Sequence, residues 1–422
     1  MQGMMAARSC SLGDRDFILI DMAAGIGGIL KPIEMDGVML DPGCHIWGHH
    51  EKLNISFFEQ ELGIRMIPVT GHCEISISED GGFRKKLAVP SFETLPSESR
   101  RLAADLARNV TPEQISTWSL DRIFREAFGS DLGDALLRIA TKFYGREPSD
   151  LSILAAQQMA MSRIKLHACS ELERMLEDDR LLGPLLCSQT LNEKSDSLVK
   201  FRYPDMGLGN LLSTFFNWIQ SRAQSIHFSE MPQSIELDSS GKGGMLRTRD
   251  KQIRFQRLMW CCNPLALSTL MEWSLPPKES TAGSPFRTLF FRLHNMNQEV
   301  EYSHDFRVES PIFRSWVPPE EMVEDASCRY VIVECPIKRA GDDVVADIST
   351  RLQQIHDLGE GQLEFLGSKP QVRFYPSMTY MKWLKTFVSE HAGEHNGILL
   401  PASPLYGKDV ITDWWEDACR IK

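Results

Sequence analysis

The sequence predicts an α/β fold with a discontinuous domain, and three observations support this prediction. Residues 16–21, Asp-Phe-Ile-Leu-Ile-Asp, form a short apolar run that ends in a carboxylate, which is typical of a buried parallel strand. Residues 97–191 carry apolar side chains at intervals of three and four, which predicts helices. Strand and turn signals return near Phe201 and continue through 226–237, 290–293 and 330–334. Strand-rich parts therefore lie on both sides of a helical part.

Composition limits the possible functions. The chain has 422 residues, of which 42% are hydrophobic and 24% charged, as in an ordinary globular protein of two or three domains. Its formal net charge of −11 argues against a general nucleic-acid-binding surface. No apolar run approaches the roughly 18 uncharged residues of a membrane span. The N-terminus also lacks the apolar core of a signal peptide, so we expect a cytoplasmic protein.

The cysteines and histidines do not predict a metal site. The ten cysteines include no C-x-x-C pair, and the adjacent Cys261 and Cys262 follow Trp260 in an apolar run that predicts buried thiols. His49 and His50 are neighbours in the sequence. Adjacent side chains do not converge on one ion in a helix or a strand, so we expect no bound metal.

Asp21 is a candidate ligand of a dinucleotide. Such a site combines a glycine-rich turn, a helix N-terminus that faces the pyrophosphate, and a second strand whose terminal carboxylate binds ribose hydroxyls. Asp21 fits the third role, and Gly3 lies 18 residues earlier, about where the last glycine of a G-x-G-x-x-G motif falls. A strand that ends in Asp is equally common without such a ligand, so this pattern alone leaves both interpretations open.

The residues after Asp21 favour the interpretation of Asp21 as a ligand of a dinucleotide. Gly27 and Gly28 are followed by residues 37–45, Gly-Val-Met-Leu-Asp-Pro-Gly-Cys-His. This G-x-x-x-D-x-G-x-H string, placed after a strand, an Asp and a glycine pair, resembles the superfamily of flavin amine oxidases, protoporphyrinogen oxidases, phytoene desaturases and UDP-galactopyranose mutases. The resemblance implies that the cofactor is FAD, with Asp21 at its ribose and the glycine pair beside its phosphates.

Two later segments follow the order of the same family. Residues 201–212, Phe-Arg-Tyr-Pro-Asp-Met-Gly-Leu-Gly-Asn-Leu-Leu, resemble its Y-P-x-x-G-x-x-x-L segment, and Tyr203 is a candidate substrate contact there. Ile235 lies near the place of the strand that contacts adenine. Ala402 and Ser403 stand in the place of the C-terminal FAD motif, where a glycine and a polar or charged residue are usual.

The beginning of the chain also departs from the family pattern. The first strand and the first two glycines of the fingerprint are absent, and the sequence starts where the first helix should already be under way. We interpret this as a late start or a fragment. Together with Ala402, this departure leads us to expect weak or substoichiometric binding of FAD.

The resemblance also suggests residues near the reacting centre. It brings the segment that contains Asp41, Gly43 and His45 toward the isoalloxazine ring, where an imidazole could bind the flavin or transfer a substrate proton. A histidine held in a turn by backbone hydrogen bonds is the alternative. Arg307 and Arg314 lie between strands that help to form the family's substrate pocket, so they could bind a carboxylate or phosphate, unless they belong to a solvated loop.

These observations predict an architecture and a function. We expect a Rossmann-like, N-terminally incomplete FAD-binding domain from residues 1–80, 200–265 and 371–422. The substrate domain would combine helices from 97–195 with an antiparallel sheet from 266–370. The leading function is FAD-dependent oxidation of a small molecule by hydride transfer to the flavin. The alternatives are an isomerase that resembles UDP-galactopyranose mutase and a cofactor-free binding or scaffold protein.

Overall fold

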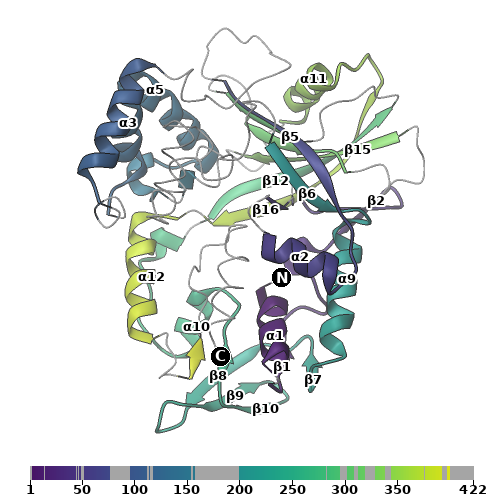
Figure 1. Ribbon diagram of the computed structural model, residues 1–422, viewed down its shortest axis with the longest axis vertical. Coiled ribbons are helices and arrows are strands. Elements are labelled where there is room, and N and C mark those ends of the chain that lie inside the picture. The colour runs from purple at the N-terminus through teal and green to yellow at the C-terminus, as the bar shows by residue number, and fades with distance from the viewer. Residues whose placement is uncertain are drawn as a thin grey trace.

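The computed structural model describes most of the chain and places it in two connected parts (Figure 1). The description covers residues 2–13, 15–43, 45, 47–48, 52–76, 96–111, 114, 117–153, 155–156, 199–281, 283–294, 302–307, 312–318, 328–337, 344–374, 376–391 and 397–399. Helices and strands are mixed throughout, which confirms the α/β fold class. Within these residues, no helix is long and apolar enough to cross a membrane.

The lower part of Figure 1 contains two pairs of parallel strands. Strand β1 (Ile18–Ile20) pairs with β7 (Ser225–His227), and β11 (Leu258–Met259) pairs with β17 (Ile398–Leu399). Helix α1 (Gln2–Leu12) packs between the two pairs. A Cβ at Gly3 of this helix would lie 3.7 Å from a side-chain carbon of Leu19, next to one pair, and 3.8 Å from Cβ of Cys261, next to the other. The predicted parallel strand is therefore present, and its partner comes from a distant segment of the chain.

Further elements complete this part. Strands β8 (Pro232–Leu237), β9 (Gly244–Thr248) and β10 (Gln252–Phe255) form an antiparallel sheet, and residues 238–243 connect β8 to β9. This sheet shares a hydrophobic core with α10 (Pro264–Leu270) and α12 (Met378–His391). The remaining elements are η1 (Gly28–Leu30), the hairpin of β2 (Ile33–Met35) and β3 (Val38–Leu40), α2 (Lys52–Gln60) and α9 (Gly207–Gln220).

A mixed sheet of eight strands dominates the upper part of Figure 1. Its order is β16 (Leu363–Phe374), β12 (Gly283–His294), β15 (Cys328–Pro336), β14 (Phe313–Trp316), β13 (Tyr302–Arg307), β5 (Met66–Ser76), β6 (Val199–Pro204) and β4 (Trp47–Gly48). All neighbours are antiparallel except β13 and β5. The sheet is thus larger than the antiparallel one expected from 266–370. It also includes strands from 47–76 and 199–204. The sequence did not predict these neighbours, because a strand pattern does not specify the partner strand.

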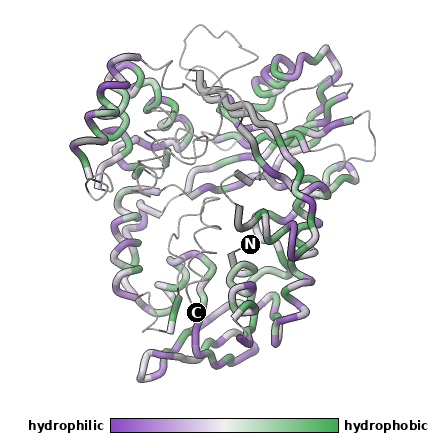
Figure 2. Tube along the Cα trace, viewed as in Figure 1, coloured by the Kyte–Doolittle hydropathy of each residue, from purple (hydrophilic) through white to green (hydrophobic). Residues whose placement is uncertain are grey.

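Two groups of helices pack against this sheet. Helices α3 (Ser97–Asn109) and α5 (Leu120–Tyr144) pack against each other beside η2 (Pro148–Asp150), and hydrophobic and hydrophilic segments alternate along them (Figure 2). Helix α11 (Val345–His356) covers one sheet face and buries Leu289, Phe291 and Leu293 of β12. A short turn, η5 (Lys278–Thr281), precedes β12. The opposite sheet face turns toward the lower part of the molecule.

Candidate functional site

A row of polar side chains crosses the sheet face that is turned away from α11. Thr288 on β12 lies opposite Glu334 on β15, and Glu334 lies opposite Arg314 on β14. We call these three residues the polar row. On one side of it the fully buried Phe290, Ile332 and Trp316 form an apolar row, and on the other side Phe286 is buried. Polar groups are costly in such a position unless they have partners, so the row marks a specialised part of the sheet.

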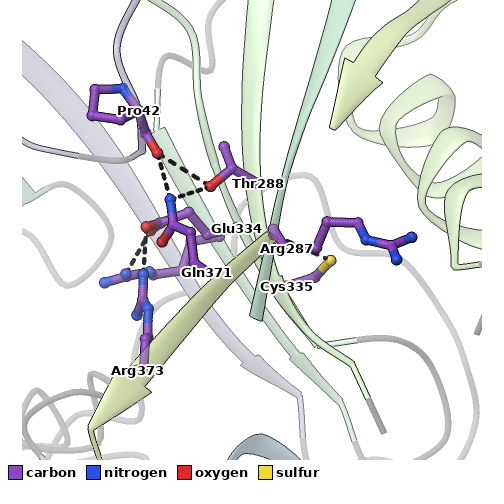
Figure 3. A network of polar contacts seen from close by, with 8 residues as sticks. Pro42, Arg287, Thr288, Glu334, Cys335, Gln371 and Arg373 are labelled. Carbon is purple, nitrogen blue, oxygen red and sulfur yellow. Dashed lines mark hydrogen bonds and ion pairs between the residues drawn. The ribbon is translucent and has the colours of Figure 1, made fainter. Parts of the chain in front are cut away.

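Glu334 binds two arginines at the centre of the polar row (Figure 3). One of its carboxylate oxygens accepts a hydrogen bond of 2.5 Å from Nη2 of Arg314, and the other accepts one from Nη2 of Arg373 on β16. The Glu334 side chain is only 3% exposed. Burial by itself would raise the pKa of Glu334, but the two guanidinium groups outweigh it and hold this pKa well below its ordinary value. The two arginines therefore stabilise the ionised form of Glu334 inside the protein.

The segment predicted to approach the flavin is attached to this row. Gln371 Nε2 donates hydrogen bonds to the carbonyl oxygen of Pro42 at 2.7 Å and to Oγ1 of Thr288 at 2.6 Å (Figure 3). Thr288 Oγ1 donates to the same carbonyl at 3.1 Å. A Cβ added at Gly43 would come within 2.6 Å of Glu334 Oε1, so only glycine allows the loop to pass this close to the carboxylate.

His45 belongs to the same cluster. Its backbone N–H donates to the Gly43 carbonyl at 3.1 Å, and its Nε2 lies 3.3 Å from the position that a Gly43 Cβ would take. The imidazole is close enough to Glu334 to contribute to the low pKa of that carboxyl. The structure thus joins two predicted residues, His45 and Arg314, which are far apart in the sequence.

Asp41 and Tyr203 form a buried pair beneath this loop. The phenol of Tyr203 donates a hydrogen bond of 2.5 Å to Asp41 Oδ2, and both side chains are at most 1% exposed. Burial raises the pKa of Asp41 to about 7, although the hydrogen bond from Tyr203 favours the ionised form. Trp316 packs on Tyr203, with ring centroids 5.0 Å apart. The structure therefore places Tyr203 where it supports the loop.

Asp21 and the glycine loop lie at the carboxyl end of β1. Asp21 is exposed, and Oδ1 of its carboxylate accepts a hydrogen bond of 2.9 Å from the N–H of Ala23. An added Cβ at Gly25 or Gly28 would meet no atom within 4 Å, so the backbone borders open space there. Gly27 has φ +106° and packs against Leu212 and Lys31. An accessible carboxylate beside an open glycine loop fits the ribose and phosphates of a dinucleotide.

The other residues predicted from the sequence lie neither in the cluster around Glu334 nor beside Asp21. Ile235 lies on β8 opposite Leu246 of β9 and is buried in the core that this sheet shares with α10 and α12. Arg307 ends β13, and its side chain lies outside the described part of the structure. Ala402 and Ser403 lie outside the described residues, as do His49 and His50. In the described part of the chain, no group of three or more His, Cys, Asp or Glu residues could hold a metal ion.

Sequence reasoning missed four residues of the cluster: Thr288, Glu334, Gln371 and Arg373. One signal was available, because Glu334 is the only charged residue in the otherwise apolar run from Tyr330 to Pro336. A charged side chain in the middle of a buried strand is rare unless it is paired. The partners of Glu334 could not be inferred in this way, since they come from two other strands.

Comparisons with known proteins identify the fold. No family model matches the chain, and no curated protein matches its sequence. Its structure is similar to cyclohexylamine oxidase from Brevibacterium oxydans IH-35A, with a TM-score of 0.65 at 12% identity over 99% of this chain and 96% of that one. A triple variant of putrescine oxidase gives 0.66 at 12% over 99% and 96%, and reduced UDP-galactopyranose mutase gives 0.65 at 12% over 99% and 91%.

The chain therefore has the same fold as these two oxidases and the mutase. The likeness extends over essentially its whole length, which agrees with the order of motifs in the sequence. At this level of identity the comparisons establish the fold, and function has to be argued from the site.

Proposed function

We propose that this protein is an FAD-dependent oxidoreductase that acts on a small organic molecule. The observation that carries the proposal is the full-length likeness to amine oxidases, combined with an accessible carboxylate and an open glycine loop at the carboxyl end of β1. In α/β sheets this end of the strands is where nucleotide ligands bind.

Particular residues would hold the cofactor. Asp21 would accept hydrogen bonds from the ribose hydroxyls, and the backbone at Gly27 and Gly28 would lie beside the phosphates. The segment that carries Gly43 and His45 would lie beside the isoalloxazine ring, next to the polar row. When bound, the flavin would supply the hydride chemistry, and the protein would bind, orient and tune it.

The residues around Glu334 would bind the substrate and define its orientation. Arg314 would provide positive charge, while Thr288 and Gln371 would hold the loop that carries His45. His45 would donate or accept a hydrogen bond at the reacting centre. Tyr203 would act through Asp41, which it holds in position from below.

A flavin-dependent isomerase is the second candidate, because UDP-galactopyranose mutase is structurally as similar to this chain as the oxidases are. The two candidates differ in net redox change. An isomerase needs the reduced cofactor and returns it unchanged, whereas an oxidoreductase consumes an acceptor.

Titration with FAD tests the proposal directly. Purified protein is mixed with FAD, and quenching of flavin fluorescence is followed together with the visible absorption spectrum. Saturable binding with a shifted spectrum is the expected result. Anaerobic mixing of the complex with small-molecule panels should then bleach the flavin for an oxidoreductase substrate. Unperturbed free-flavin fluorescence at saturating protein would refute the proposal and favour a cofactor-free binding or scaffold protein.

A further inference from the structure

A cysteine, a histidine and a glutamate meet at one end of the large sheet. His294 is the last residue of β12 and lies opposite Cys328, the first residue of β15. Sγ of Cys328 is 3.6 Å from Nδ1 of His294, and Nε2 of His294 is 3.7 Å from Oε2 of Glu364 on β16. The imidazole therefore lies between a thiol and a carboxylate. We call these three residues the thiol cluster.

The thiol cluster is separate from the candidate site around Glu334. His294 follows Thr288 by six residues on β12, which corresponds to roughly 20 Å along an extended strand. Both side chains lie on the same sheet face, because alternate residues of a strand point to the same side. The chemistry of the thiol cluster therefore has to be explained independently of the polar row.

Arg292 holds the carboxylate of the thiol cluster in place. Its Nη1 donates a hydrogen bond of 2.9 Å to Oε2 of Glu364, and its Nη2 forms an ion pair with Asp36 in the turn between β2 and β3. Burial by itself would lower the pKa of this guanidinium, but a hydrogen bond with Tyr330 and the nearby negative groups, Cys328 among them, raise it. The guanidinium is thus close enough to the sulfur to stabilise a thiolate.

The thiol cluster has the arrangement of an activated nucleophile. A thiol contacts an imidazole, and the second nitrogen of that imidazole faces a carboxylate that orients it. The imidazole can accept the thiol proton, and the carboxylate stabilises the imidazolium that forms. Cys328 and His294 are both half-buried, and the Glu364 side chain is 52% exposed, so a small reagent can reach the sulfur from solvent.

We propose that Cys328 is a nucleophilic thiol that hydrogen peroxide oxidises to a sulfenic acid. Nδ1 of His294 takes the thiol proton, and the sulfur attacks one oxygen of the peroxide. A sulfur–oxygen bond forms while the oxygen–oxygen bond breaks. The proton on His294 passes to the departing hydroxide, which leaves as water. The sulfur is oxidised by the two electrons that reduce the peroxide, and an added thiol reverses the modification.

Hydrogen peroxide suits the thiol cluster better than a larger or an anionic electrophile. It is small enough to reach a half-buried sulfur, and because it is uncharged the exposed carboxylates of Asp36 and Glu364 do not repel it. Its reduction requires a base for the thiol and a proton donor for the hydroxide, and His294 provides both. Peroxide is added from outside in the test, so the inference does not depend on the binding of FAD.

Trapping of the sulfenic acid tests the proposal in the full-length protein. The wild type is treated with hydrogen peroxide and dimedone at neutral pH, and the labelling of each cysteine is followed over time by mass spectrometry. We expect Cys328 to be labelled about tenfold or more faster than Cys10 and Cys262. Cys10 is also half-buried but contacts the thioether of Met259 at 3.7 Å, whereas Cys262 is exposed. The comparison therefore separates activation of the thiol from access to it.

Substitutions in the thiol cluster identify the base. His294→Gln should slow the labelling of Cys328 about tenfold or more, because glutamine cannot take the thiol proton. Glu364→Gln should slow it by a smaller factor, and Glu364→Asp, which keeps the charge, should restore part of the rate. His227→Gln is the matched control, since His227 is a half-buried histidine at the end of β7, and it should leave the rate unchanged. Labelling of Cys10 in the same samples reports any general loosening of the fold.

Three results would overturn the inference. The first is labelling of Cys328 in the wild type that is no faster than that of Cys10 and Cys262. The second is a rate for His294→Gln equal to that of the wild type. The third is faster reaction of Cys328 with glutathione disulfide than with peroxide, which would favour thiol–disulfide exchange. If His294→Gln does not fold, as judged by circular dichroism, the wild-type comparison and the Glu364 variants decide the question.

Discussion

Gly43 and Glu334 approach so closely that a Cβ at position 43 would lie 2.6 Å from Oε1 of the glutamate. Two arginines fix this carboxylate, so it cannot move aside as the end of a free side chain would. The contact joins the D-x-G-x-H loop to the large sheet and so links the two parts of the molecule.

Gly43→Ala should consequently destabilise the protein. We expect a loss of roughly 1–3 kcal/mol in the free energy of unfolding, as for other overpacked sites. Urea unfolding followed by circular dichroism measures it. Gly25→Ala is the control, because a Cβ there meets no atom within 4 Å, and it should change stability by less than about 0.5 kcal/mol. Equal effects of the two substitutions would show that the Glu334 contact is not the cause.

Thr288→Val should loosen the attachment of the loop while conserving side-chain volume. The variant removes the hydroxyl that donates to the Pro42 carbonyl and accepts from Gln371, and it leaves buried polar groups with fewer partners. The expected cost is about 1–3 kcal/mol in urea unfolding. Thr269→Val, which removes an exposed hydroxyl on α10, should cost much less. A neutral Thr288→Val would mean that the loop is held by other contacts.

Asp41 should make stability depend on pH. Its pKa is raised from 3.8 to about 7 in the folded chain, so the folded state holds the proton more tightly than the unfolded state. The stability that results is fully present below about pH 4 and is lost as the pH rises through about 7. Asp41→Asn cannot ionise, so its stability should change less between pH 4 and 8.

At pH 8 the free energy of unfolding of Asp41→Asn should exceed that of the wild type by on the order of 2–4 kcal/mol. Unfolding in urea at a series of pH values provides the comparison. Asp131→Asn, on the exposed face of α5, is the control and should reproduce the wild-type pH profile. A parallel profile for Asp41→Asn would contradict the buried, proton-binding role of Asp41.

Asp21→Ala should weaken FAD binding by about tenfold to a hundredfold. The carboxylate would accept charge-assisted hydrogen bonds from ribose hydroxyls, and losing them costs roughly 1.5–3 kcal/mol. Flavin fluorescence titration measures the affinity. Asp16→Ala changes an exposed carboxylate just before β1 and should leave the affinity intact. Unchanged binding by Asp21→Ala would assign its carboxylate to the turn, where it accepts from Ala23 N–H.

His45→Gln should alter the flavin rather than the stability of the protein. Glutamine keeps the polarity and approximate size of histidine but cannot become cationic, so we expect a shifted flavin spectrum or slower flavin reduction. The free energy of unfolding should change by less than about 1 kcal/mol. His391→Gln, which removes a ring stacked on Trp273 at 3.9 Å, serves as the control for replacing a histidine. Lower stability with an unchanged flavin spectrum would make His45 a turn residue.

Local patterns in the sequence were sufficient for the α/β class, for the strand that ends near Asp21, and for the glycine loop behind it. Each of these features depends on residues that are neighbours in the chain. The alternation of apolar residues and the positions of glycines express the requirements of local backbone geometry directly. The D-x-G-x-H string likewise marked the loop that contacts the large sheet.

Tertiary structure alone decided how the site is assembled. Gln371 binds the carbonyl of Pro42 across 329 positions of sequence, and Glu334 receives one arginine from each of two other strands. Such partners are set by the order and register of strands in a sheet, and a shift of one residue would turn every one of these side chains to the opposite face. A strand pattern in the sequence specifies which face is buried, but the pairing energy that selects the neighbouring strand exists only when the whole sheet is formed.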